Sequence, residues 1–280
     1  MLQSPDILGE TCFLHGRTRR RPPRVAHLLP PNVMSAVSTF FPFSLVLPNM
    51  PGVAMELMRS LDDDNLSLND LALVIGKDPA LSASVLRVAN TARYSPLRSI
   101  SSLREATATL GMVTLRNLAM ASCMARSFPA VPGLDRRRFW RRGLACAHYA
   151  ALLARPAMVD GEVAYLGGLM LQTGQLLMMQ VEREGVAVIE ASVARPGDRF
   201  VLEQARWQCT HADVTAELAR RWKFPDALLQ GFAAASRPGE ARPFQPLGGV
   251  LYLGATSAST WTGWRNGRCT PPTWTPKSTA

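Results

Sequence analysis

Apolar residues recur every three or four positions through most of the chain from residue 45 to residue 258, which is the spacing of one buried face on an α-helix. In the segment 80–92, for example, Leu81, Val85, Leu86, Val88 and Ala89 form one apolar stripe. The pattern predicts helices over residues 53–61, 68–75, 80–92, 103–110, 113–128, 135–154, 160–182, 198–208, 212–222 and 247–258, and one more that follows Pro225. No run alternates with period two, so we expect an all-α fold, a helical bundle without a sheet.

Polar residues mark the starts of several of these helices. Ser67 with Asp70, and Thr210 with Asp213, have the spacing of a capping box, in which a hydroxyl and a carboxylate satisfy free backbone N–H groups. Asp78-Pro79 combines an N-cap side chain with a proline at the first helical position. These three signals predict helix starts independently of the apolar pattern.

The two ends of the chain lack the helical pattern. Residues 1–44 are rich in Pro, Arg and Ser and are expected to form a disordered leader. Residues 259–280 contain Trp, Thr and Pro without periodicity and are expected to form an irregular tail. Within the domain over 45–258, Pro129, Pro132 and Gly133 interrupt the helices. We therefore expect an N-terminal helical half over 45–130 and a second helical half over 134–258.

Charge and cysteine content narrow the classes of protein. The net charge is +10, but the two ends each hold an excess of three positive charges, so the middle of the chain carries only about +4. A surface this mildly basic does not require a nucleic-acid partner. Five scattered cysteines without a CxxC pair favour a reducing, cytoplasmic location. No apolar run reaches the roughly 20 residues of a membrane span, and no secretory signal is expected.

Five short stretches, taken in order, carry a resemblance to a known family. They read DPAL (78–81) with LRVANTARY (86–94), ISSLREA (100–106), FW (139–140), GGL (167–169), and HADV (211–214) with WKFP (222–225). In this order the chain resembles the HDOD family, a group of output-type modules related to the HD metal-dependent phosphohydrolases. The resemblance covers roughly three quarters of the chain. It implies that the N-terminal half packs on a degenerate HD-like half, and that the protein serves bacterial signal transduction.

The resemblance also implies that the metal site of the HD enzymes has been lost. The His expected after Phe139-Trp140 falls on Arg142, the His-Asp pair falls on Leu171 and Gln172, and a further His falls near Ala235-Ser236. Only His211 keeps a side chain of ligand type. Leucine does not coordinate cations, a neutral amide is a poor substitute for a carboxylate, and an arginine repels a divalent cation. We therefore expect no metal, no cofactor and no catalytic residues, and we expect that the protein is not an enzyme.

Five side chains are candidates for contact with a ligand or a partner. Arg138, Arg141 and Arg142 share one face of the predicted helix over 135–154 and suit a phosphate or an acidic partner, or they belong to an ordinary solvated helix start. Gln172 is the fourth candidate. His211 is the fifth, either as a structural side chain that bonds across a helix junction or as a contact inside a ligand pocket.

The sequence therefore predicts a non-catalytic signalling module that binds an unidentified signalling protein or a nucleotide messenger. Two alternatives stay open at this point. One is a metal-dependent phosphohydrolase with an altered site. The other is a nucleic-acid-binding protein that uses the arginine face over 136–142 together with the basic leader. Nucleic acid is a possible partner but not the favoured one. Neither the oligomeric state nor the pathway is indicated by the residues.

Overall fold

The computed structural model describes residues 29–43, 45, 47–60, 65–91 and 99–260, and the backbone of 264–265 and 268–269. Over these residues the chain is helical almost throughout, which confirms the all-α prediction. The first helices are α1 (Pro31–Ser38), α2 (Gly52–Arg59), α3 (Leu68–Gly76), α4 (Pro79–Ala89), α5 (Leu103–Leu110) and α6 (Met112–Ser127). The later helices are α7 (Arg136–Ala154), α8 (Gly161–Met170), α9 (Thr173–Val181), α10 (Arg183–Ser192), α11 (Asp198–Trp207), α12 (His211–Arg221), α13 (Asp226–Ala235) and α14 (Pro246–Thr260).

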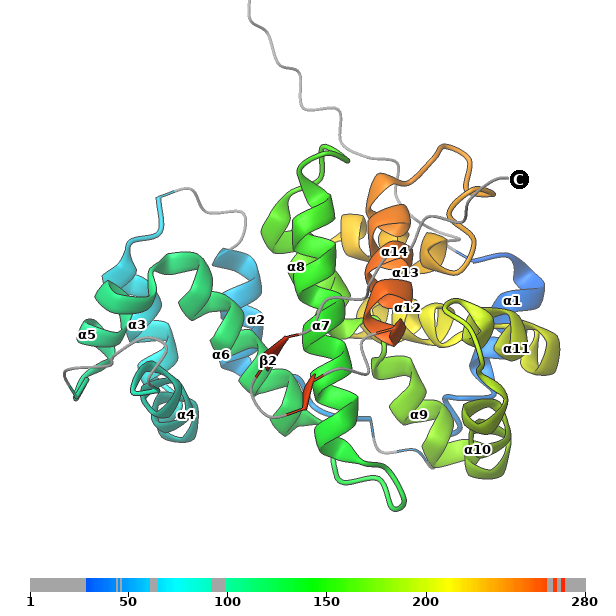
Figure 1. Ribbon diagram of the computed structural model, residues 1–280, viewed down its shortest axis with the longest axis horizontal. Helices are drawn as coiled ribbons and strands as arrows, with labels where there is room; N and C mark the ends of the chain where they lie inside the picture. Colours follow the sequence, from blue (N-terminus) through cyan, green and yellow to red (C-terminus); the bar gives the residue numbers. More distant parts are fainter. Residues whose placement is uncertain are drawn as a thin grey trace, which may run out of the picture.

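The helices form two groups that lie side by side (Figure 1). Helices α2–α6 pack on one another, with α3, α4 and α5 around one end of α6. Helices α7–α14 form the larger group, in which α7 packs against both α8 and α14, and α12 contacts both α9 and α13. The groups meet where α6 lies against α8, and there Arg116 of α6 forms a largely buried ion pair with Glu162 of α8.

Small residues let the central helices of the larger group approach closely. A methyl group placed on Gly168 of α8 would lie 2.7 Å from the Cα atom of Ala147 in α7. A methyl group on Gly254 of α14 would lie 3.0 Å from the carbonyl oxygen of Cys146, also in α7. The glycines therefore let α8 and α14 approach the backbone of α7 closely, and α7 and α14 both contribute to the candidate site.

The predicted helix starts are confirmed. Ser67 with Asp70 and Thr210 with Asp213 both form complete capping boxes, and the Asp78 carboxylate accepts from the backbone N–H groups of residues 80 and 81. In the described part of the chain no helix is both long and apolar enough to cross a membrane.

The predicted leader is wrong for residues 31–38, which form α1. Val33, Val37 and Phe40 are buried, and the Phe40 ring meets the Trp207 ring edge-on with centroids 5.6 Å apart. Helix α1 packs on α12, in the larger group (Figure 1). The spacing of Val33, Val37 and Phe40, four and then three residues, is helical. However, a helix of two turns that follows a proline is too short to give a periodic signal in the sequence. Residues 1–28 lie outside the described part of the chain.

The structure differs from the predicted irregular tail over 259–280 in two places. Helix α14 continues to Thr260, and two residues, Trp264–Arg265 (β1), pair antiparallel with Arg268–Cys269 (β2). The ladder is only two residues long, so its strands carry no periodic signal in the sequence. The rest of the predicted tail lies outside the described residues.

Candidate functional site

The helix predicted over 160–182 is broken at the position where the resemblance places a lost His-Asp pair. Helix α8 ends at Met170, α9 begins at Thr173, and Leu171 and Gln172 lie between them. Leu171 is fully buried. The prediction of one continuous helix is therefore wrong at its centre.

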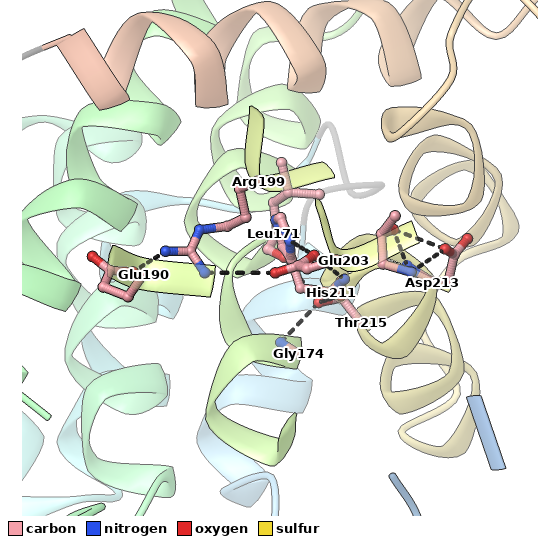
Figure 2. A network of polar contacts seen from close by, with 9 residues as sticks. Leu171, Gly174, Glu190, Arg199, Glu203, His211, Asp213 and Thr215 are labelled. Carbon is pink, nitrogen blue, oxygen red and sulfur yellow. Dashed lines mark hydrogen bonds and ion pairs between the residues drawn. The ribbon is translucent and has the colours of Figure 1, made fainter. Parts of the chain in front are cut away.

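A threonine hydroxyl holds this break in place (Figure 2). Thr215 Oγ1, from α12, lies 2.9 Å from the carbonyl oxygens of both Leu171 and His211 and accepts the backbone N–H of Gly174 at 2.9 Å. Gly174 leaves no room for a side chain, since a methyl group there would lie 2.1 Å from the His211 carbonyl oxygen. The start of α9 thus packs directly against the start of α12.

His211 begins α12 and is bound to a buried carboxylate. Its backbone N–H donates to Glu203 Oε2 at 2.8 Å, and its ring Nδ1 lies 2.6 Å from the same oxygen. Both side chains are almost completely buried. The Phe200 ring stacks on the imidazole with centroids 4.8 Å apart and 19° between the planes. The predicted hydrogen bond across a helix junction is confirmed, because Glu203 belongs to α11 and His211 to α12.

Further charged side chains extend this pair into a row. Arg199 of α11 lies 3.6 Å from Glu203 through Nη1 and bonds Glu190 of α10 through Nη2 (Figure 2). The other carboxylate oxygen of Glu190 lies 3.7 Å from Arg142 Nη1, on α7. His211, Glu203, Arg199, Glu190 and Arg142 therefore form one row of polar contacts across four helices.

Burial shifts the acid–base properties of this row. Burial raises the pKa of the Glu203 carboxyl, but the contacts with His211 and Arg199 outweigh it, so the net pKa lies below its ordinary value. Burial lowers the pKa of Arg142, and the neighbouring charge of Arg138 lowers it further. Burial likewise lowers the pKa of Arg199. Arginine side chains keep their charge in proteins, and a guanidinium group binds anions through paired hydrogen bonds.

A cavity of about 400 Å³ opens beside the charged row. Its wall comes from α7, from the break between α8 and α9, from α10 and α11 with the loop between them, from His211, and from the end of α14. The loop enters α11 at Gly197, whose φ of 90° is a conformation that favours glycine. A side chain there would also approach the Tyr252 hydroxyl, at 3.1 Å.

Four of the five predicted contact residues line this cavity: Arg138, Arg142, Gln172 and His211. Arg141 does not belong to the wall, although the helical spacing placed it on the same face. Glu190, Arg199 and Glu203 complete the site, and sequence reasoning did not identify them. The i,i+4 spacing of Arg199 and Glu203 was the one available signal, and it is common on solvated helices.

The residues at this site do not fit the divalent metal of the HD enzymes. Leu171 and Ala235 are buried apolar side chains, and Arg142 supplies a cation where a ligand is needed. Across the described ranges, no three His, Cys, Asp or Glu side chains are gathered in a way that would hold a metal ion.

Comparisons with known proteins agree with this fold. The sequence profile of the HDOD domain matches residues 47–238. A candidate phosphohydrolase from Shewanella amazonensis is 28% identical, with a TM-score of 0.66 over 84% of this chain and 82% of the other. An HDOD domain protein of unknown function from Geobacter sulfurreducens is 20% identical, with a TM-score of 0.68 over 80% and 76%. A candidate signal transduction protein from Marinobacter aquaeolei is 24% identical, with a TM-score of 0.68 over 80% of this chain and 53% of the other.

One curated relative, an uncharacterized protein from Treponema pallidum, is 24% identical over 186 residues. The match covers 65% of this chain but only 36% of the relative, so this chain corresponds to about a third of the relative's length. The HDOD match leaves out α1 and α14, although the end of α14 forms part of the cavity wall.

Proposed function

Since the chain belongs to the HDOD domain family, we propose that it is a non-catalytic bacterial signal-transduction module that acts by binding a partner protein or a nucleotide messenger. One observation carries the proposal. The family resemblance places metal ligands at Arg142 and Leu171, and in this structure Arg142 lines the cavity while Leu171 lies in the helix break held by Thr215. A site with this residue set favours binding over metal-dependent hydrolysis, because the described residues gather no set of ligands for a metal ion that would activate a water molecule.

The similar structures carry two different descriptions, one of signalling and one of hydrolysis. The Marinobacter aquaeolei neighbour is described as a candidate signal transduction protein, and its likeness at 24% identity concerns the fold alone. The Shewanella amazonensis neighbour, described as a candidate phosphohydrolase, favours the enzymatic alternative. The chemistry of the donor set argues against that alternative, since Arg142 and Arg199 would repel a divalent cation.

The nucleic-acid alternative loses part of its proposed surface. Arg136 donates through Nη1 to the Phe128 carbonyl oxygen at 3.0 Å and through Nη2 to the Ala125 carbonyl oxygen. Arg142 turns into the cavity, toward Glu190. Two of the arginines on the 136–142 segment therefore serve internal contacts, which leaves a smaller basic face for phosphate backbones.

The proposal is tested with the purified full-length chain. Elemental analysis is expected to find no stoichiometric transition metal, and cyclic dinucleotides are expected to stay intact with added Mn²⁺. Affinity capture from the source cell is then compared for wild type, Arg142→Ala and Arg137→Ala. A partner that is lost with Arg142→Ala but kept with Arg137→Ala supports the proposal. Metal-dependent hydrolysis that disappears in His211→Ala would overturn it.

A further inference from the structure

The wall of the cavity carries more positive than negative charge. Arg138, Arg142, Arg195 and Arg199 line it, and Glu190 is the one carboxylate among the lining residues. Glu203 lies behind Arg199 and offsets one more charge. Four guanidinium groups therefore face two carboxylates. Since guanidinium groups bind phosphate through paired hydrogen bonds, the surplus charge favours a phosphate-bearing ligand.

Glu190 shows where an anion is stabilised in this cavity. Its carboxylate lies between Arg199 and Arg142, which come from different helices, and half of its side chain is exposed. It therefore sits at the rim and is free to swing toward solvent, whereas Arg199 is only 10% exposed and remains in place. A phosphate group would take the position of the Glu190 carboxylate and would compete with it.

Gln172 gives a second, independent indication of a ligand. Its side chain lines the cavity and is 3% exposed, and its buried Oε1 atom has no hydrogen-bond partner. Buried polar atoms in proteins are nearly always paired. A ligand hydroxyl would supply the missing donor, and the amide turned over would instead donate to a phosphate oxygen.

The rest of the wall fits an organic group rather than a free inorganic anion. Val193, Pro196 and Ala255 add apolar surface to the wall. The volume of about 400 Å³ falls in the range of small-molecule sites. We propose that the cavity binds a nucleoside phosphate, with its phosphate on Arg142 and Arg199 and a sugar hydroxyl on Gln172. This inference rests on the proposed function and names the class of ligand at the same site.

Calorimetric titration of the full-length protein with ADP tests the inference, with adenosine and inorganic pyrophosphate as comparison ligands. ADP is expected to bind more tightly than pyrophosphate, and adenosine is expected to give no measurable heat. Arg142→Gln is expected to weaken ADP by about tenfold or more, the effect of losing a charge-assisted hydrogen bond. Arg137→Gln makes the same charge change on an exposed position of the same helix and is expected to leave ADP affinity unchanged.

Glu190→Gln is the sharpest variant, because it is expected to tighten ADP binding several-fold by removing the competing carboxylate. Because the Glu190 side chain is half exposed, this substitution is expected to disturb the fold less than Arg142→Gln does. Absence of ADP binding at millimolar concentration, equal losses in Arg137→Gln and Arg142→Gln, or weaker binding in Glu190→Gln would each overturn the inference. Pyrophosphate binding as tight as that of ADP would overturn the nucleoside part of it. Phosphorus NMR of the same samples separates the two proposals, since hydrolysis of ADP would refute the non-catalytic function while leaving the binding site supported.

Discussion

Replacing Glu203 by Gln tests whether the buried charged row stabilises the fold. The Glu203 side chain is 2% exposed and faces the backbone N–H and Nδ1 of His211 on one side and the Arg199 guanidinium on the other. Removing one partner of a buried ion pair costs about 3–5 kcal/mol, because a charge is left buried without compensation. Arg199 keeps Glu190, and the Gln carbonyl still accepts one N–H, so we expect the lower end, about 3 kcal/mol. Urea unfolding near neutral pH measures this loss.

The pH dependence of the unfolding free energy gives a second test with the same variant. Because the folded-state pKa of Glu203 lies below the unfolded value, its ionised form stabilises the fold at pH values above about 4.3. That stabilisation is lost as the pH falls through the lowered folded-state pKa. The difference in unfolding free energy between wild type and Glu203→Gln should therefore narrow progressively as the pH is lowered below about 4.3.

Glu240→Gln is the matched control, because Glu240 is 73% exposed and pairs with Arg237 at 3.5 Å on the surface. An exposed pair of this kind contributes less than about 1 kcal/mol. If Glu203→Gln costs no more than Glu240→Gln, or if its cost does not change with pH, the charged row does not stabilise the fold as argued.

Two further predictions follow from helix packing and from the lost metal ligands. Gly168→Ala is expected to lower the unfolding free energy by about 2 kcal/mol, since the methyl would press on the backbone of Ala147. Gly161→Ala, with nothing within 4 Å of the new methyl, should instead raise it by about 0.4–1 kcal/mol. Equal melting temperatures for the two variants would contradict the packing argument. The double variant Leu171→His, Gln172→Asp is expected to lose about 3 kcal/mol of stability through buried polar groups and to bind no metal. Stoichiometric manganese in elemental analysis of that variant would show that the neighbouring arginines do not exclude a cation.

Local rules predicted much of this fold, because they depend on neighbours in the sequence. The capping box of Thr210 and Asp213 requires only three residues of spacing, so it fixed the start of α12 and with it the place of His211. The amphipathic stripe of α4 likewise reads directly from the chain, with Leu81, Val85 and Ala89 buried.

The features that the sequence did not predict depend on contacts between residues far apart in the chain. Leu171 and Gln172 contain no helix breaker, and the break between α8 and α9 is held by Thr215, 44 positions beyond Leu171. Helix α10 was not predicted at all, although it supplies Glu190. Arg199 lies on an amphipathic helix where charges usually face water, and only the packing of α11 against the cavity turns it inward.

The hydrogen bonds of the Thr215 hydroxyl hold the helices together without using the side chains that line the cavity. The bonds that keep α8, α9 and α12 in register run through Thr215, Gly174 and backbone carbonyl groups, and none of them involves a side chain of the cavity wall. Mutation can therefore exchange Arg142 or Glu190 for other residues and alter what is bound without dismantling the architecture. Modules built in this way are able to diverge in the signals they receive while their scaffold stays the same.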